Sequence, residues 1–332
     1  MTDPKSGNYK WFVLTILTVV YAFNFIDRQI LVILQEPIKA ELGLSDTQLG
    51  LLTGFSFAVV YVTAGIPIAW LADRSNRRNI VAASLGVWSV MTALSGMVQN
   101  YTQLLLARLG VGLGEAGGSP PSHSMLSDYF PEEQRGTALS IYTTGIYLGI
   151  FFGYFAGGWI ADTYGWRNAF FIVGIPGVVL AFLLLLLVRE PPRTVLPNTV
   201  ENEKASFKET IAFLLQRPAF WWIALGCSTA SFVGYGNGNF FPSLLIRNYG
   251  LTVTEVGMFM GVISGTTGML GTFLGGYLAD RWGKHDKRWY VRIALWGLVL
   301  SLPLSYYTLI ATEPLYVVLA YTPAHILNTL YL

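Results

Sequence analysis

Two pairs of charged residues stand inside apolar stretches and are the residues best suited to chemistry. Asp27 and Arg28 are adjacent in YAFNFIDRQILVIL, and Arg108 and Glu115 lie in a second stretch, ARLGVGLGEAGGSPPSHS. Burial favours the neutral form of a carboxyl group, whereas a nearby arginine favours its anion, so conformation could switch protonation. We therefore predict proton transfer at Asp27 and Glu115, and binding of an anionic group at Arg28 and Arg108.

Arg108 and Glu115 share one predicted helical face with small residues. Five residues follow one another at steps of four, three, four and three: Arg108, Gly112, Glu115, Ser119 and Ser122. Such steps keep side chains on one side of an α-helix, and the two charges stand two turns apart, about 10 Å. We expect them to line a central cavity opposite Asp27 and Arg28. A purely structural pairing of the two stretches is the alternative.

Four polar residues are further candidates for substrate contact: Asn24, Ser119, Asn237 and Asn239. The two later asparagines stand in GYGNGN, which equally fits a glycine-rich break in a helix. Four glycines form a different pattern, since Gly145, Gly149, Gly153 and Gly157 repeat every four residues. That spacing predicts a ridge of small residues for close helix contact.

These residues belong to a chain with the composition of a membrane protein. Of its 332 residues, 53% are hydrophobic and only 12% are charged, against about 25% in soluble proteins. Apolar runs of about 20 residues recur, each long enough to cross the hydrocarbon layer as a helix. Intramembrane charges are costly, about 2.5–3.5 kcal/mol each on insertion scales, so they normally face a partner or a cavity. We expect an all-α, multi-pass membrane protein.

Reading the apolar runs between charged or Gly/Pro-rich breaks gives ten predicted spans. They cover residues 10–34, 49–72, 79–99, 102–126, 137–161, 168–188, 217–246, 255–279, 289–311 and 314–332. The long polar connection follows the sixth span. The prediction is a six-helix bundle at 1–190, a linker at 191–216, and a second bundle at 217–332 with about four helices. The end of the linker, 206–216, is predicted to be an amphipathic helix at the membrane interface.

The placement of basic residues predicts the orientation of these spans. Most of the 21 Lys and Arg residues fall in ends and loops on the side of the amino terminus. The positive-inside rule therefore predicts that the amino terminus and the linker are cytoplasmic. The net charge of +2 reflects this topology, and we expect no nucleic-acid partner. A single cysteine, Cys227, leaves no partner for a cysteine-based metal cluster, and we expect no metal or other cofactor.

An internal repeat indicates two related halves. GLSDTQLGLLTG at 43–54 matches GLTVTEVGMFMG at 250–261, and AWLADRSNRR at 69–78 matches GYLADRWGKH at 276–285. Both copies begin with a predicted capping box, Ser45 with Gln48 and Thr252 with Glu255. Two six-span halves joined by a cytoplasmic linker are typical of a secondary transporter.

The LADR repeats resemble the loop between the second and third spans of the major facilitator superfamily. An aspartate that ends a span beside basic residues could pair with neighbouring helix ends and hold one conformation. The predicted gating residues are Asp73, Arg74, Arg77, Asp280 and Arg281. The alternative is a basic cluster that only sets topology. The first copy departs from the family pattern, with Ala69 and Asn76 at its glycine positions.

The first half also resembles the Spinster family, in NFIDRQIL, SDTQLGLLTGFSFAVVY, GIPIAWLADRSNRR, RLGVGLGEAGGSPPSHSMLSDYFP and GWRNAFF. The second half is similar mainly through residues 217–246 and the LADR repeat. The resemblance implies the major facilitator fold, two pseudo-symmetric six-helix bundles that work by alternating access. It implies transport of lysolipids or sphingoid phosphates, proton-coupled in some members. Because that fold has twelve spans, the second bundle is expected to be incomplete in the 332 residues.

The sequence therefore predicts a proton-coupled secondary transporter of amphipathic, anionic, lipid-like substrates. We expect a monomer in the lipid bilayer of a bacterial inner membrane. A carrier of small organic anions or drugs and an uncoupled facilitator are the alternatives, and a non-transporting receptor is a third. A membrane enzyme is disfavoured because the chain has no H-E-x-x-H, G-x-S-x-G or cysteine cluster. Import and export, and symport and antiport, stay open.

Overall fold

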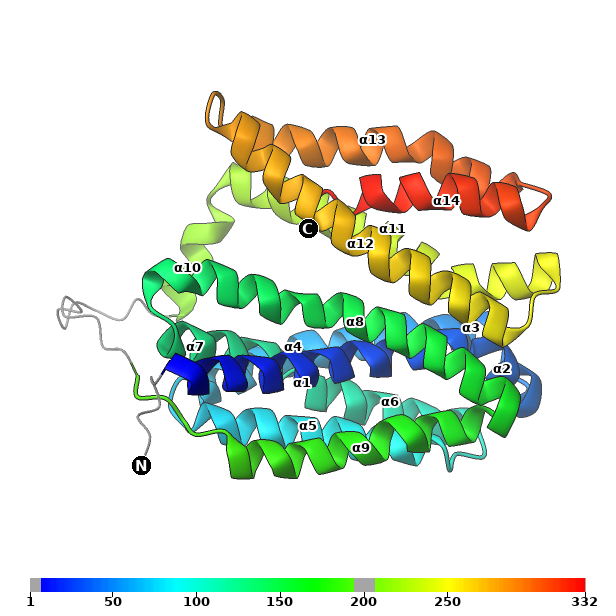
Figure 1. Ribbon diagram of the computed structural model, residues 1–332, viewed down its shortest axis with the longest axis horizontal. Helices are drawn as coiled ribbons and strands as arrows, with labels where there is room; N and C mark the ends of the chain where they lie inside the picture. Colours follow the sequence, from blue (N-terminus) through cyan, green and yellow to red (C-terminus); the bar gives the residue numbers. More distant parts are fainter. Residues whose placement is uncertain (1–6, 194–206, 332) are drawn as a thin grey trace.

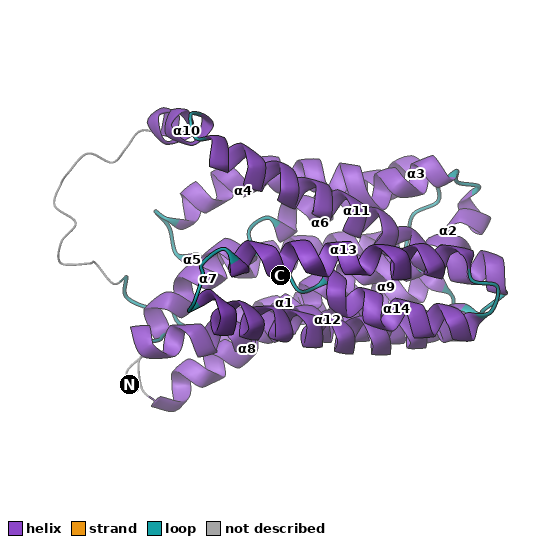
Figure 2. Ribbon diagram, turned by 90° about the horizontal axis from the view of Figure 1, so that it is seen from above, coloured by secondary structure: helices purple, strands orange, loops and turns teal. Residues whose placement is uncertain are grey.

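The computed structural model describes residues 7–193 and 207–331, and these residues form helices joined by short connections, with no strand among them (Figure 2). Up to residue 193 the elements are α1 (Gly7–Ile33), α2 (Gln35–Leu42), α3 (Asp46–Gly50), the π-helical turn η1 (Leu51–Phe55), α4 (Ser56–Ala72), α5 (Arg77–Ser95), α6 (Tyr101–Glu115), α7 (Ser119–Tyr129), α8 (Glu132–Tyr164) and α9 (Trp166–Leu187). From residue 207 they are α10 (Phe207–Leu215), α11 (Pro218–Tyr249), α12 (Val253–Gly283), α13 (Trp289–Ile310) and α14 (Pro314–Asn328).

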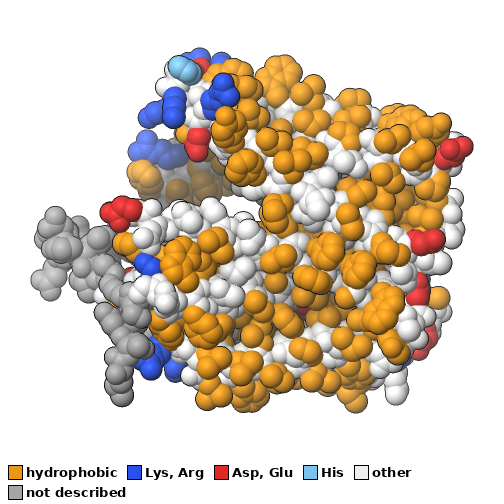
Figure 3. Space-filling model, viewed as in Figure 1, with side chains coloured by type: hydrophobic (Ala, Val, Ile, Leu, Met, Phe, Trp, Pro, Cys, Tyr) orange, Lys and Arg blue, Asp and Glu red, His pale blue; other side chains and the backbone are white. Residues whose placement is uncertain are grey.

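The helices form two groups that meet along α8 and α12. Helices α1–α9 make up one group, and α11–α14 lie above it in Figure 1, with α10 at one end of α11. We call these groups the first half and the second half. In Figure 3 the space between them is hollowed at the end where α1 begins, and Lys and Arg side chains gather there. The face in view is otherwise largely hydrophobic, with Asp and Glu at the opposite end.

Six helical segments in the described ranges are long and apolar enough to cross a membrane. They are Gly7–Ile33, Asp46–Ala72, Glu132–Tyr164, Trp166–Leu187, Val253–Gly283 and Trp289–Ile310. Nine of the ten predicted spans coincide with one helix or a pair of consecutive helices, and the span 49–72 covers α3, η1 and α4. The stretch 102–126 is such a pair, because α6 ends at Glu115 and α7 begins at Ser119. The prediction of one continuous fourth helix was therefore wrong.

The residues of the internal repeat adopt matching local structures. Ser45 accepts a hydrogen bond from the backbone N–H of Gln48, and Thr252 accepts one from that of Glu255. Both capping boxes are complete, as predicted. The glycines that precede them, Gly43 and Gly250, both have φ of 65°, in the left-handed region that glycine adopts without strain. The repeat therefore fixes the start of α3 and α12 in the same way.

The predicted glycine ridge lets α8 lie directly against α1. A Cβ atom on Gly149 would stand 2.5 Å from the carbonyl oxygen of Ala22, and one on Gly145 would stand 2.7 Å from that of Thr18. Because neither glycine has a side chain, the two backbones approach closely. This contact sets the position of α1, which carries Asp27.

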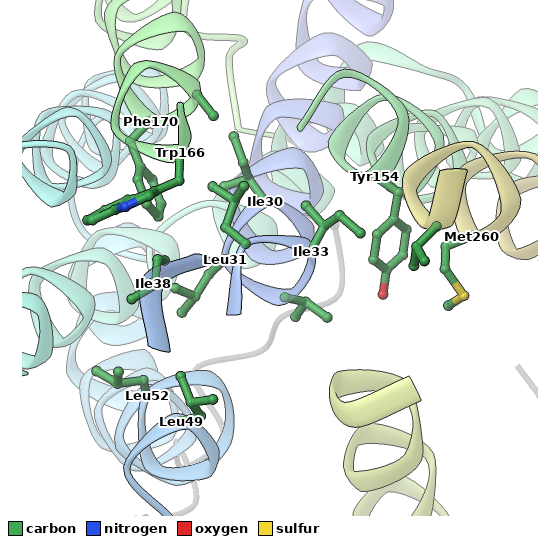
Figure 4. Packing of buried hydrophobic residues seen from close by; sticks show 14 of the residues in the cluster. Ile30, Leu31, Ile33, Ile38, Leu49, Leu52, Tyr154, Trp166, Phe170 and Met260 are labelled. Carbon is green, nitrogen blue, oxygen red and sulfur yellow. The ribbon is translucent and has the colours of Figure 1, made fainter. Parts of the chain in front are cut away.

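The opposite face of α8 packs against α12 of the second half in the same manner. A Cβ atom on Gly257 would stand 2.5 Å from the carbonyl oxygen of Tyr154. One buried cluster contains Tyr154 of α8, Met260 of α12 and Ile33 of α1 (Figure 4). The close contact between the halves therefore continues into the core around α1.

Candidate functional site

The four charged residues of the two apolar stretches form two crossed ion pairs between α1 and α6. Arg28 Nε lies 2.6 Å from Glu115 Oε2, and Arg108 Nη1 lies 3.2 Å from Asp27 Oδ1. Adjacent residues of α1 thus reach charges two turns apart on α6. The prediction that these pairs face each other is confirmed, whereas their roles in transport stay predictions.

Asp27 has a hydrogen-bond partner for each of its carboxylate oxygens. Oδ1 accepts from Arg108, and Oδ2 accepts from the hydroxyl of Thr92 on α5 at 2.5 Å. Asp27 and Thr92 are each 1% exposed, and Arg108 is 2% exposed. A buried carboxylate needs such compensation, because it has lost its water shell.

Glu115 is the last residue of α6 and is less fully compensated. Its Oε2 pairs with Arg28, whereas its buried Oε1 has no hydrogen-bond partner among the described residues. The carboxyl end of a helix carries the negative end of the helix dipole, which opposes a second negative charge there. Arg28 is therefore the main group that stabilises the Glu115 anion.

The break after Glu115 follows from the residues around it. Gly114, Gly117 and Gly118 let this segment approach α5, and a Cβ atom on Gly114 would stand 2.6 Å from the backbone nitrogen of Trp88. Two prolines lie in the first turn of α7, where the missing N–H groups are tolerated. The chain thus ends one helix at a carboxylate and starts another beside it.

Arg28 connects this buried site to the space between the two halves. Its side chain is 17% exposed, and its guanidinium carbon lies 4.9–5.2 Å from the ring centres of Phe25, Phe57 and Tyr61. It also lines a small cavity of about 40 Å³ together with Tyr235 and Asn239 of α11. Aromatic rings stabilise a cation over their faces, so they hold Arg28 at the cavity.

The remaining predicted substrate contacts lie at different distances from this cavity. Asn24 is buried, and its Oδ1 has no hydrogen-bond partner among the described residues. Ser119 lies beside the hydroxyl groups of Tyr21 and Tyr142. Asn239 donates to the backbone of Thr53 at 3.2 Å and lines the cavity. Their contact with a substrate stays a prediction.

Asn237 lies away from the cavity face of its helix. Helix α11 continues through GYGNGN without a break, so the alternative of a helix break was wrong. Two residues along an α-helix turn about 200°, which places Asn237 on the face opposite Tyr235 and Asn239. The structure thus brings only the later asparagine to the charged site, and a role of Asn237 in binding also stays a prediction.

Of the predicted gating residues, Arg77 is the most firmly held. Its Nη1 lies 2.6 Å from Asp128 of α7, and its Nε lies 2.7 Å from Glu190, just after α9. Arg74 lies over the ring of Trp70, and the backbone carbonyl of Asp73 accepts from Arg193. This network ties the first LADR segment to the chain that follows α9.

The corresponding residues of the second half make weaker contacts. Asp280 accepts from the hydroxyl of Tyr290 at 3.4 Å, and Arg281 donates to that of Tyr277 at 3.2 Å. Among the described residues, the hydrogen bonds of both LADR segments stay within their own halves. A gating role for all five residues stays a prediction.

Two features of the structure were not predicted from the sequence, the contact of Thr92 with Asp27 and the ion pairs of Arg247. Thr92 was one hydroxyl in an apolar run, and nothing in its spacing singled it out. Arg247 of α11 pairs with Glu36 of α2 and Asp46 of α3 at 2.8 and 2.6 Å, across the two halves. Its signal was an isolated cation in the connection 247–254, which the predicted topology places on the same side as the connection 35–48 with Glu36, Glu41 and Asp46. In the described ranges no group of three or more His, Cys, Asp or Glu side chains could hold a metal ion.

Known proteins resemble the chain over nearly its whole length. Residues 17–327 match the family described as Major Facilitator Superfamily. A protein of Mycolicibacterium smegmatis called an MFS-type efflux pump is 35% identical over 99% of this chain and 76% of its own length. A probable galactarate/D-glucarate transporter of Bacillus subtilis is 27% identical over 83% of this chain and 66% of its own length.

A solved structure shares both the sequence pattern and the arrangement of helices. It is the crystal structure of a bacterial homolog to the human lysosomal transporter Spinster, in an inward-facing and unoccupied conformation. It is 33% identical to this chain and superimposes with a TM-score of 0.86, over 98% of this chain and 74% of that one. The predicted resemblance to Spinster is thereby confirmed.

Proposed function

The chain belongs to the major facilitator superfamily and is a multi-pass membrane transporter, and on this premise we propose that it couples protons to the movement of amphipathic anions. The observation that carries the proposal is the pair of crossed ion pairs, whose two arginines both line the cavity, with Arg28 the more exposed of the two. The resemblance of this chain to the Spinster family supports a lipid-like substrate.

The distribution of charge favours an anionic head and an apolar tail. Arg28 and Arg108 both belong to the first half, and both line the cavity. The wall contributed by α11 consists of Tyr235 and Asn239, which carry no full charge. A substrate whose anionic group faces α1 and whose apolar part faces α11 would match both walls.

Competition for Arg28 couples the proton to the substrate. Ionised Glu115 holds Arg28 Nε at 2.6 Å. When Glu115 takes up a proton, the charge attraction is lost and the guanidinium becomes available to an anionic head in the cavity. When substrate leaves, Arg28 returns to Glu115 and the proton is released. Asp27 and Arg108 form the deeper pair that supports this exchange.

The hollow end of the molecule is the cytoplasmic side in this proposal. It carries Lys and Arg side chains, as the positive-inside rule requires of a cytoplasmic side, and α1 begins there (Figures 1 and 3). In this conformation the cavity would therefore load or release substrate on the cytoplasmic side. A monomer in a bacterial inner membrane completes the proposal, with the residues between the halves as a cytoplasmic linker.

Purified protein in liposomes tests the proposed function. Uptake of a lysophospholipid, a sphingoid phosphate and a dicarboxylic sugar acid is measured with and without an imposed pH gradient. We expect gradient-driven accumulation of the lipid-like anions and accompanying proton movement. Accumulation that ignores the gradient in every case would contradict proton coupling.

A carrier of small organic anions is the second candidate. It is favoured by the similarity to the probable galactarate/D-glucarate transporter, and the cavity of about 40 Å³ is small in this conformation. Transport of the sugar acid without the lipid-like anions would select it, and the same two arginines would then hold carboxylate groups.

A further inference from the structure

We propose that Thr92 is a positioning residue that responds to the charge of Asp27 by moving its single hydroxyl hydrogen between two acceptors. The inference rests on the proton coupling proposed above and adds a residue to it. Thr92 touches neither the cavity nor Arg28, so it acts through Asp27.

The Thr92 hydroxyl lies within hydrogen-bond distance of two acceptors. Its Oγ1 is 2.5 Å from Asp27 Oδ2 and 2.9 Å from the backbone carbonyl oxygen of Trp88. A hydroxyl group has one hydrogen to donate and two lone pairs that can accept. Thr92 can therefore donate to only one of these two oxygens at a time.

The protonation state of Asp27 decides which oxygen receives the hydrogen. When Asp27 is ionised, Thr92 donates to Oδ2 because a charged acceptor makes the stronger hydrogen bond. When Asp27 is protonated, its own O–H can donate to Thr92 Oγ1, and Thr92 then donates to the carbonyl of Trp88. No bond within Thr92 needs to break, since its hydroxyl only rotates. In this inference Asp27 gains and loses its own proton by exchange with solvent, as a second titrating carboxylate beside Glu115.

The second acceptor links Asp27 to the segment that carries Glu115. The backbone of Trp88 packs against Gly114, and its ring packs against Gly118, one on each side of the break between α6 and α7. When the hydrogen bonding of the Trp88 carbonyl changes, it therefore changes at the point where α5 packs against the break between α6 and α7. This places Thr92 between the two carboxylates of the site.

Three charged groups face or neighbour Asp27. Arg28 is on its own helix, and Arg108 and Glu115 come from α6. Helix α5 contributes Thr92, and α8 presents Gly149 and Gly153 to this part of α1. The pH response of Asp27 therefore reflects the two arginines and Glu115 as well as Thr92, and the test must separate these contributions.

Infrared difference spectroscopy of the purified chain measures the protonation of Asp27 directly. The carboxylic acid C=O band is titrated with pH, and subtraction of the Asp27→Asn variant isolates the contribution of Asp27. Thr92→Val removes the hydroxyl but keeps the shape of the side chain. We expect the midpoint to rise by about one pH unit, because the carboxylate loses a hydrogen bond to a charged group.

Two variants control for packing. Thr92→Ser keeps the hydroxyl and should restore the wild-type midpoint. Thr18 of α1 is also buried, but among the described residues its hydroxyl donates to its own helix alone, to the carbonyl oxygen of Leu14 at 2.8 Å. Thr18→Val should leave the midpoint of Asp27 in place. If Thr92→Val does not move the midpoint, or if Thr18→Val moves it equally, the role of Thr92 is overturned.

Proton flux in liposomes separates this inference from the proposed function. Wild-type protein without substrate-induced proton flux would overturn the proposed coupling, and with it the role of Thr92 in coupling. Coupled wild-type protein with an unmoved infrared midpoint in Thr92→Val would overturn the role of Thr92 alone. A raised midpoint together with proton coupling at correspondingly higher pH supports both.

Discussion

Arg247 at the end of α11 lies 2.6 Å from Asp46 at the start of α3, so an ion pair joins the two halves. The same guanidinium lies 2.8 Å from Glu36 of α2. The elements that carry these residues meet at the end of the molecule away from α10 and the start of α1, opposite the hollow (Figures 1 and 3). At one end an ion pair joins the two halves, whereas at the other end the space between them is hollowed.

Reversing this charge should favour opening at the α2–α3 end. Arg247→Glu would place a negative charge against Glu36 and Asp46, and like charges at this distance repel. In a Cys227→Ser background, which lacks the native thiol, spin labels are placed at the exposed positions Tyr164 and Glu313, one in each half. The distance between the two labels reports how far the halves separate at that end. We expect the distance distribution to gain a longer component.

Arg167 provides the matched control for Arg247. It pairs with Glu41 at 2.8 Å with similar exposure, but both residues belong to the first half. Arg167→Glu should therefore leave the distance between the labels unchanged. Combining Arg247→Glu with Asp46→Arg should restore the closed distribution. Equal distributions for wild type and Arg247→Glu would show that this ion pair does not hold the halves together.

Arg108→Ala should destabilise the protein more than Arg28→Ala. Arg108 is the partner of an almost fully buried Asp27, and loss of one partner from a buried ion pair costs about 3–5 kcal/mol. Glu115 is fully buried, but the side chain of Arg28 is 17% exposed and lines the cavity, so its removal leaves space through which water can reach the charge on Glu115. Thermal unfolding in detergent measures the difference, and Asp27→Asn added to Arg108→Ala should recover much of the loss. Equal melting temperatures for the two single variants would contradict this ranking.

The exposure of the two arginines also predicts which of them meets the substrate. Arg28→Lys should weaken binding of a phosphate-headed ligand, because the single ammonium group of lysine cannot make the bidentate contact that a guanidinium group makes with a phosphate. A neutral analogue of the same chain length should bind as before. Calorimetric titration of both ligands gives the comparison, and an equal loss for both would indicate a purely structural role for Arg28.

Gly149→Val should disrupt the site from the far side of α1. Its new side chain would overlap the backbone of Ala22 and the Cβ atom of Phe25, both 2.5 Å from the position of a Cβ atom. Because α1 would have to move, we expect a lower melting temperature and slower transport. Gly136→Ala, on the same helix but with no atom within 4 Å, should raise stability by about 0.5–1 kcal/mol. Unchanged melting of Gly149→Val would contradict the close packing.

Periodicity predicted the faces of these helices but not how they rotate against one another. The steps between Arg108 and Glu115 indicated one face, and their opposition to Asp27 and Arg28 followed from the cost of unpaired charge. The crossed partners were beyond the sequence, because each arginine could reach either carboxylate. The glycine ridge on α8 was predictable, since backbone contact needs small residues, whereas its two partners, α1 and α12, depend on tertiary packing.

Local signals were more informative at helix starts than within spans. The capping boxes at Ser45 and Thr252 marked the starts of α3 and α12 because their hydrogen bonds close within four residues. The break after Glu115 was missed, since an apolar run of small residues looks continuous although packing against Trp88 interrupts it. In GYGNGN the glycines suggested a break, but α11 stays helical through them. Tertiary contacts decided both outcomes.

Glu115→Gln should uncouple transport from protons. Glutamine has the shape of a protonated glutamate, can still accept a hydrogen bond from Arg28 and cannot release a proton. Because the charge attraction at 2.6 Å is lost, Arg28 would stay available to an anionic head. We expect downhill exchange of substrate to survive and accumulation driven by a pH gradient to vanish. Substrate flux and proton flux are measured in the same liposomes.

The control for this substitution is Glu41→Gln, which removes another ion-paired carboxylate at 2.8 Å from its arginine but far from the cavity. It should leave the ratio of protons to substrate unchanged. If Glu115→Gln also keeps that ratio, Glu115 is not the coupling group and Asp27 becomes the carboxylate to test. If wild type moves substrate without protons, the chain is a facilitator, and Glu115 then serves to hold Arg28 in place. Loss of coupling in Glu115→Gln alone would assign the exchanged proton to the carboxylate whose second oxygen is unpaired among the described residues.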